Sequence, residues 1–173
     1  KRFCLSNLQK RCPKSPGKLS ANKSHLVCKL MEKMVKDVVL AHLIENNLLS
    51  KKQFGFVSGR STVTQLLNYL DKCAEIVANG GVVDSIYFDF SKAFDTVPHQ
   101  RLSVKMKAYG IEGQLLSWIE AFLSGREQRV RVNGELSDSK SVISGIPQGS
   151  VLGPLLFVLY INDLPDTVQS NIL

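Results

Sequence analysis

Two carboxylates, Asp89 and Asp95, lie in the most distinctive stretch of this sequence, residues 85–98. The residues around Asp89 are β-branched or aromatic and apolar on both sides of the alternation, which predicts a strand covered on both faces. A carboxylate there is costly unless a cation or hydrogen-bond donors satisfy it. An acid at the end of such a strand can hold a divalent metal against a phosphate. The alternative is structural, with Asp89 accepting backbone N–H bonds and Asp95 capping the next helix.

A second stretch with chemical potential is the turn at residues 144–153, where two glycines and a proline surround Gln148. Glycines let another molecule approach the backbone closely, and the Gln148 amide offers both a donor and an acceptor. Pro154 then begins an almost wholly apolar helix that runs through Ile161. In isolation, a glycine-rich turn is weak evidence for a binding site.

Arg60 lies in a loop, residues 53–61, that also holds two aromatic residues and two glycines. This composition could form a backbone platform near a phosphate or a base. The alternative is a loop that is simply pinned by Phe54 and Phe56.

A β-hairpin is predicted at residues 127–144, because the dipeptide Asn133-Gly134 favours a tight turn. Arg129 and Arg131 fall on one face of its outgoing strand, with Arg126 close by. Such a cationic face could follow a phosphate backbone. The competing explanation is an edge strand that is solvated and protected by charge.

The composition is that of a folded protein, with 44% hydrophobic residues in a chain of 173. The net charge of +7 belongs to the first 25 residues, which hold seven of the 22 basic residues and none of the 15 acidic ones. This basic arm fits contact with nucleic acid, and a solvated tail is the alternative. The four cysteines lack zinc-ligand spacing, so we expect reduced thiols in a nuclear or cytoplasmic protein that is neither secreted nor membrane-inserted.

Apolar residues at helical spacing predict helices from Val27 to about Asn46 and from Ser61 to about Asn79, followed by two shorter helices between Pro98 and Gly125. We expect the apolar stripes of the first two helices to be core: Val27, Leu30, Met34, Val38, Ala41 and Ile44, then Leu66, Leu70, Cys73 and Val77.

Several of these stretches together resemble one family. Residues 87–99, Tyr-Phe-Asp-Phe-Ser-Lys-Ala-Phe-Asp-Thr-Val-Pro-His, look like the first catalytic motif of reverse transcriptases from non-LTR (LINE-type) retrotransposons. Residues 144–153 look like their next core motif, and residues 53–62 resemble the finger-region motif. Residues 118–134 match the stretch between these motifs. The resemblance runs from about Val27 to the end, and the order of separated motifs makes it specific.

The resemblance implies an α+β right-hand polymerase fold. Fingers would occupy residues 26–83, an incomplete palm residues 84–173 with the hairpin 127–144 inserted, and the thumb would be missing. Residues 1–25 would remain a basic, irregular arm.

The resemblance also implies RNA-directed DNA synthesis by two-metal phosphoryl transfer, with Mg²⁺ (or Mn²⁺), an RNA template, a DNA primer and dNTPs. Asp89 and the backbone of Phe90 would hold metal. The remaining roles would be the sugar gate at Phe94, contact with the incoming nucleotide at Gln148, close approach of the base pair at Gly149, and a template or nucleotide contact at Arg60.

One departure from the family pattern bears on activity. The family carries a Tyr/Phe-Ala-Asp-Asp turn soon after the region 162–165, and no such acidic pair follows here. We therefore expect a polymerase fragment that is inactive alone. A non-catalytic nucleic-acid-binding remnant and a decayed transposon fragment are the alternatives.

Overall fold

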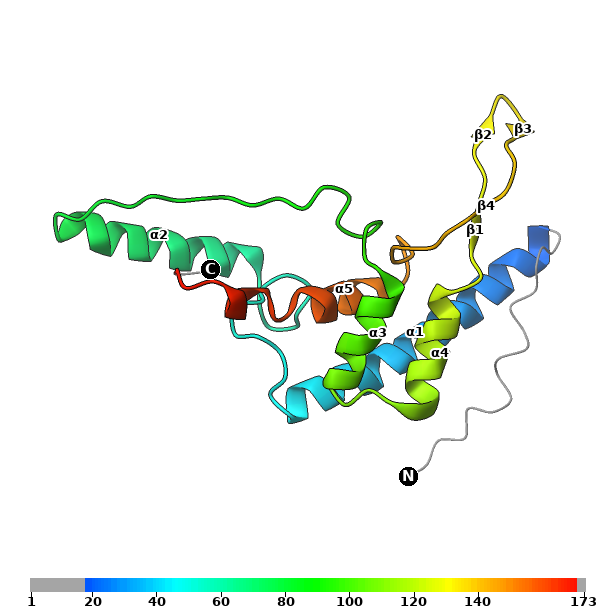
Figure 1. Ribbon diagram of the computed structural model, residues 1–173, viewed down its shortest axis with the longest axis horizontal. Coiled ribbons are helices and arrows are strands. Elements are labelled where there is room, and N and C mark those ends of the chain that lie inside the picture. The colour runs from blue at the N-terminus through cyan, green and yellow to red at the C-terminus, as the bar shows by residue number, and fades with distance from the viewer. Residues whose placement is uncertain (1–17, 171–173) are drawn as a thin grey trace.

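The computed structural model describes residues 18–170, with side chains from residue 26 onward. Five α-helices, one 3₁₀ helix and four short strands follow one another along this part of the chain (Figure 1). Their bounds are α1 Lys18–Glu45, α2 Thr62–Ala78, α3 His99–Ala108, α4 Gly113–Leu123, β1 Glu127–Gln128, β2 Arg131–Val132, β3 Glu135–Leu136, β4 Lys140–Ser141, α5 Gly153–Ile161 and η1 Leu164–Thr167.

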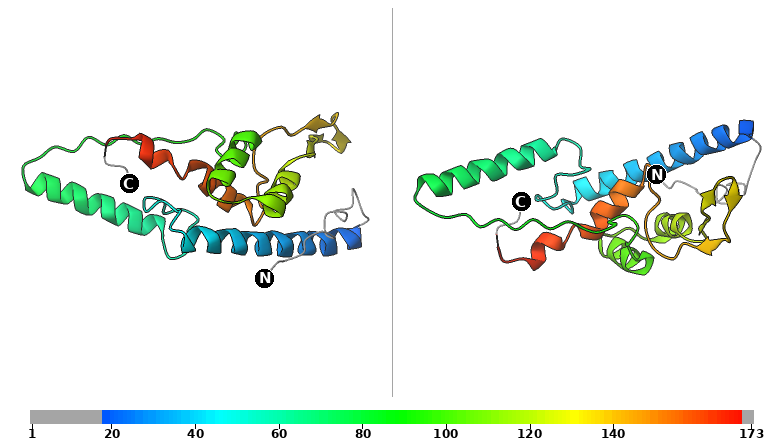
Figure 2. Two further views of the ribbon diagram at one scale, coloured as in Figure 1. Left: turned by 60° about the horizontal axis from the view of Figure 1, so that its bottom comes forward. Right: turned by 90° about the horizontal axis from the view of Figure 1, so that it is seen from above.

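The hydrophobic core lies between α1, α3, α4 and α5. Figure 2 shows α1 running along one side of the group that the other three helices form. Leu102 and Met106 of α3 and Ile119 of α4 are fully buried. The remaining fully buried large side chains are Leu43, Leu123, Leu152, Leu156, Leu159, Val39, Val97 and Val158.

Helix α1 differs from its prediction in both its start and its buried face. It begins at Lys18 rather than near Val27, so the irregular arm predicted for residues 1–25 is wrong over 18–25; residues 1–17 lie outside the described residues. The predicted core stripe is also wrong, because all six of its residues are exposed. The buried face instead carries Glu32, Val35, Val39 and Leu43. Apolar residues occupy two faces of this helix, so periodicity alone could not choose between them.

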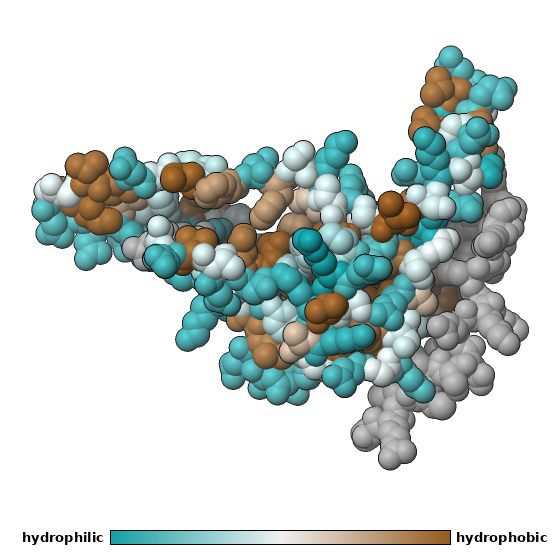
Figure 3. Space-filling model, viewed as in Figure 1, coloured by the Kyte–Doolittle hydropathy of each residue, from teal (hydrophilic) through white to brown (hydrophobic). Residues whose placement is uncertain are grey.

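Helix α2 projects from the core and buries none of its side chains (Figure 1). Its start is as predicted, since the Ser61 hydroxyl accepts a hydrogen bond from the N–H of Thr64 at 3.1 Å. The predicted core stripe is wrong here too, with Leu66, Leu70 and Val77 about 60% exposed. Figure 3 shows apolar side chains uncovered along this helix.

The strand predicted around Asp89 does not form a sheet in the described part of the chain. Residues 84–90 are extended and exposed, and they run beside α2, where the hydroxyl groups of Tyr69 and Tyr87 lie 3.1 Å apart (Figure 1). A strand is stable only when a neighbour accepts its backbone hydrogen bonds. The described residues offer this segment no such neighbour, so the prediction of a strand covered on both faces is wrong here.

The predicted hairpin is present as two short antiparallel pairs, β1 with β4 and β2 with β3. Asn133 and Gly134 form its turn with φ values of 51° and 93°, the left-handed conformation that this dipeptide favours. The hairpin stands away from the helices (Figure 1). Separately, no helix among the described residues is long and apolar enough to cross a membrane.

The position of the core predicts a clear difference between two leucines. Leu156→Ala should lower the free energy of unfolding by about 2–5 kcal/mol, because it leaves a cavity among α1, α3 and α5. Leu66→Ala on the exposed face of α2 should change it by less than about 0.5 kcal/mol. Urea denaturation of both variants checks this, and equal effects would contradict the assignment of the core.

Candidate functional site

The two motif stretches meet in one junction, formed by backbone hydrogen bonds between residues 94–98 and residues 144–146. The N–H of Gly145 donates to the carbonyl of Val97 at 2.8 Å, and the N–H of Ile146 donates to the carbonyl of Phe94 at 2.7 Å. Pro98 and Ser144 form an isolated antiparallel bridge beside them. Sequence segments almost fifty residues apart are thus joined through their main chains.

Gly145 is required where the two segments touch. Its φ is +84°, and a Cβ atom at this position would lie 2.7 Å from the carbonyl oxygen of Asp95 and 2.8 Å from the Asp95 Cα. Both the backbone conformation and the close approach exclude a larger residue without movement.

Gln148 is held over the same junction. Its Nε2 donates to Oδ1 of Asp95 at 3.0 Å, and both side chains are exposed. The next residue, Gly149, has a φ of +79°, and nothing lies within 4 Å of the position of its missing Cβ. The turn therefore presents an amide group and an open stretch of backbone to solvent.

Phe94 is packed into a cluster of three rings. Its ring stacks on Phe157 of α5 with centroids 4.8 Å apart, and Phe56 meets it edge-on at 6.1 Å. The cluster links the loop before α2, the segment after Asp89 and the helix after the glycine-rich turn. Phe94 is half-buried, so part of its side chain is open to solvent.

Asp89 and Phe90 lie outside the junction, on the extended segment. The Asp89 carboxylate is exposed, with neither a hydrogen bond nor an ion pair among the described residues. The structure thus places Gln148 beside Asp95, rather than joining it to Asp89.

A complete metal site is not formed by the described residues. They hold no group of three or more His, Cys, Asp or Glu side chains that could bind a metal ion. Asp89 offers one free carboxylate to a cation, whereas Mg²⁺ requires several oxygen ligands. The donor set in this part of the chain therefore fits only a fraction of a magnesium site.

Comparison with known proteins decides the family. A family described as "Reverse transcriptase (RNA-dependent DNA polymerase)" matches residues 10–172. The chain belongs to the reverse transcriptase family. It is 31% identical over 139 residues to the "Probable RNA-directed DNA polymerase from transposon X-element" of Drosophila melanogaster, covering 80% of this chain and 15% of that protein.

Mobile-element jockey supplies further relatives of this chain. Its RNA-directed DNA polymerase is 32% identical over 138 residues in Drosophila funebris and 33% identical over 137 residues in Drosophila melanogaster. These matches cover 80% and 79% of this chain and 15% of each relative, so the chain is a LINE-type reverse transcriptase fragment that spans about a seventh of the relatives' length. No solved structure shows a significant match.

Arg60 stabilises its own loop. Its Nη1 donates to the carbonyl oxygens of Ser50 and Gln53, both at 2.7 Å. These bonds close the loop that precedes α2. A nucleotide or template contact by Arg60 remains a prediction.

Arg126 is half-buried and bonded to the main chain, unlike the exposed Arg129 and Arg131, and its contact with nucleic acid remains a prediction. Its Nε donates to the carbonyl of Leu123 at 2.8 Å, and its Nη2 donates to the carbonyl of Gly145. Desolvation by burial lowers the pKa of this guanidinium. Arg129 and Arg131 on the hairpin are exposed, as predicted.

Asn162 is a buried residue whose role the sequence did not reveal. Its Nδ2 donates to the carbonyl of Leu48 at 2.8 Å and to the hydroxyl of Tyr109 at 3.0 Å, while its Oδ1 accepts from the N–H of Ser50 at 2.8 Å. Its signal was an amide placed directly after an apolar helix, a position suited to capping.

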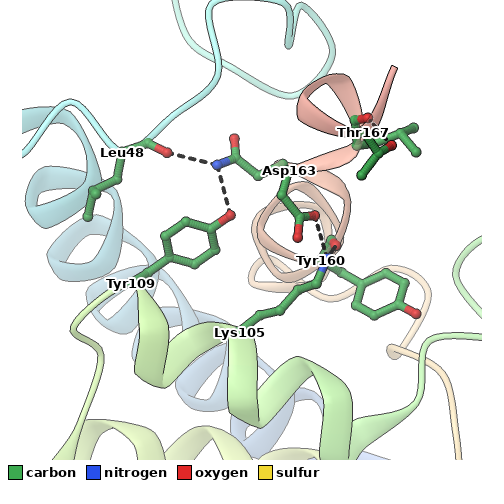
Figure 4. A network of polar contacts seen from close by, with 8 residues as sticks. Leu48, Lys105, Tyr109, Tyr160, Asp163 and Thr167 are labelled. Atoms are coloured by element: carbon green, nitrogen blue, oxygen red, sulfur yellow. Dashed lines mark hydrogen bonds and ion pairs between the residues drawn. The ribbon is translucent and has the colours of Figure 1, made fainter. Parts of the chain in front are cut away.

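Lys105 of α3 adds a second link to the end of α5. Its ammonium donates to the carbonyl of Tyr160 and forms an ion pair with Asp163 (Figure 4). Together with Asn162, it fixes the helix that follows the glycine-rich turn.

Two glycines of the turn should respond differently to substitution. Gly149→Ala should cost about 1–2 kcal/mol, because only the positive φ opposes it. Gly145→Ala should cost at least about 3 kcal/mol, since the new methyl group also forces the Asp95 backbone away. Urea unfolding of the two variants measures this, and a smaller loss for Gly145→Ala would contradict the junction.

Proposed function

We propose that this chain supplies one side of the nucleotidyl-transfer site of an RNA-directed DNA polymerase. The observation that carries the proposal is the junction that holds the turn with Gln148 and Gly149 against residues 94–98. Phosphoryl transfer depends chiefly on positioning and on neutralising charge, so a turn held by main-chain hydrogen bonds beside the Asp95 carboxylate suits this chemistry. In the intact enzyme the partners are an RNA template, a DNA primer and dNTPs.

Asp89 is the proposed metal-binding carboxylate, with the carbonyl of Phe90 beside it. Bound Mg²⁺ (or Mn²⁺) would neutralise charge on the reacting phosphate oxygens. The exposed, unpaired carboxylate supports this role, because no protein group has to leave it before a cation binds. The other carboxylates of the site must come from outside the described residues.

The groups around the turn are proposed to bind the nucleotide. Gln148 offers its amide to the incoming dNTP, and the open backbone at Gly149 lets the new base pair lie close. Phe94 is the proposed sugar gate, and its stacking on Phe157 of α5 fixes the ring. Arg60 is the proposed contact from the loop before α2.

We propose that the chain alone does not extend primers. A chimera with a complete polymerase tests the role of Asp89 independently. Residues 1–173 with Mg²⁺, primer–template and dNTPs should extend no primer, because one carboxylate cannot hold two ions. The chimera carries residues 26–170 in place of the matching segment of the Drosophila melanogaster jockey polymerase. It should extend primers, and Asp89→Asn should reduce its kcat by at least about a thousandfold.

The matched control for Asp89→Asn is Asp71→Asn, which changes an exposed aspartate on α2. It should leave primer extension by the chimera within about twofold. Extension by residues 1–173 alone, or an active Asp89→Asn chimera, would refute the proposal.

A second candidate function is nucleic-acid binding through the hairpin, favoured by its exposed Arg129 and Arg131. The double substitution Arg129→Ala, Arg131→Ala should weaken RNA binding by residues 1–173. It should also reduce the slope of log K against log salt by about 1.4, because two phosphate contacts are lost. Fluorescence anisotropy over a salt series measures both.

The control replaces two exposed cations of α3, Arg101→Ala and Lys107→Ala, which keeps the net charge equal to that of the hairpin variant. Equal losses in the two variants would show a non-specific effect of charge and would refute a role of the hairpin.

A further inference from the structure

The glycine-rich turn is held at both ends by charged side chains that come from outside it. At its start, Arg126 donates to the carbonyl of Gly145. At its end, the Oε2 atom of Glu32 accepts the N–H groups of Val151 and Leu152 at 2.6 and 3.2 Å. Glu32 reaches across from α1, far away in the sequence.

Glu32 is a buried carboxylate that is satisfied by main-chain donors. Its side chain is 7% exposed, and no lysine or arginine of the described residues forms an ion pair with it. A buried acid is expensive unless hydrogen bonds compensate for its lost hydration. Two backbone donors to one carboxylate provide that compensation, and they also fix where those donors lie.

The position of these two N–H groups explains why a carboxylate suits them. Leu152 is the N-cap residue of α5, and no side chain of its own caps the helix. The first N–H groups of a helix lack acceptors within the helix, and negative charge is favourable there. Glu32 therefore caps α5 from another helix through the N–H of Leu152, where the glycine-rich turn ends, and the Ser150 hydroxyl accepts the next N–H, that of Gly153, at 2.9 Å.

Arg126 makes equally specific hydrogen bonds at the start of the glycine-rich turn. Its guanidinium bridges the carbonyl groups of Leu123 and Gly145, and Nε2 of His99 lies 2.8 Å from the same Gly145 oxygen. The planar guanidinium can donate in two directions at once, which an ammonium group does less well. The end of α4 and the start of the turn are thus joined through one side chain.

We propose that Glu32 and Arg126 are positioning residues for the nucleotide-binding turn. They fix its two ends, so that the amide of Gln148 stays over Asp95 and the backbone at Gly149 stays open. The role of the turn in binding a nucleotide rests on the proposed function. The anchoring of the turn is tested separately.

The first experiment is hydrogen–deuterium exchange on residues 1–173. Glu32→Ala should raise the exchange rates of the Val151 and Leu152 amides by about tenfold or more, because bonds to a charged acceptor are lost. Glu32→Gln retains one acceptor oxygen and should recover part of the protection. The control is Glu45→Ala, an exposed residue of the same helix, which should leave the turn unchanged.

Hydrogen–deuterium exchange also tests Arg126→Lys, with Arg129→Lys as the control at an exposed arginine. Arg126→Lys should raise exchange of the Gly145 and Ile146 amides, while the exposed control has no effect. Unchanged rates in the turn, or an equal rise over the whole chain in Glu32→Ala and Arg126→Lys, would overturn the proposal.

The second experiment measures nucleotide use in the jockey chimera. Glu32→Gln should raise the KM for dNTP by about tenfold and change kcat by less than about twofold, because the turn moves while the metal-binding carboxylates stay in place. Glu45→Gln should change neither constant. If the chimera is active and depends on Asp89, but Glu32→Gln leaves the KM for dNTP as unchanged as Glu45→Gln does, the positioning role is overturned. A chimera that remains active without Asp89 would refute the proposed function, and the exchange rates would still decide the anchoring.

Discussion

The main-chain hydrogen bonds between residues 94–98 and 144–146 are the constraint on which the site depends. They join two segments that are otherwise irregular, and a side chain at Gly145 would drive those segments apart. Gln148 and Phe94 owe their positions to this junction rather than to a sheet. The junction rests in turn on buried residues at both of its edges, Val97 and Ile146.

Helix α1 serves as the base for this arrangement. Its inner face packs Val35, Val39 and Leu43 into the core, and its buried Glu32 caps α5. The far end of α5 is fixed by Asn162, which bonds to the loop after α1. Helix α1 and the loop that follows it thus hold both ends of α5, and the glycine-rich turn leads into the first of these ends.

Local chemistry in the sequence predicted the boundaries of elements well. Ser61, Pro98, Pro154 and the dipeptide Asn133-Gly134 each act through their immediate neighbours, and each begins or turns an element as expected. The family also followed from the order of local motifs. Features that depend on contacts between distant parts of the chain were not predicted. Which face of α1 is buried depends on helices far along the chain, and the buried face carries Glu32 where an apolar residue was expected. The segment around Asp89 needs a hydrogen-bonding neighbour that the described residues lack, and the direction of Arg126 is set by a carbonyl in another loop.

The most direct measurement of the central claim is photo-crosslinking of a dNTP analogue in the jockey chimera bound to primer–template, followed by peptide mapping. If the junction presents the turn to the incoming nucleotide, the label will fall on peptides that contain residues 145–150 and 86–95. It will be lost when unlabelled dNTP competes. Labelling confined to α2 or to the hairpin, with the turn unmarked, would contradict the account.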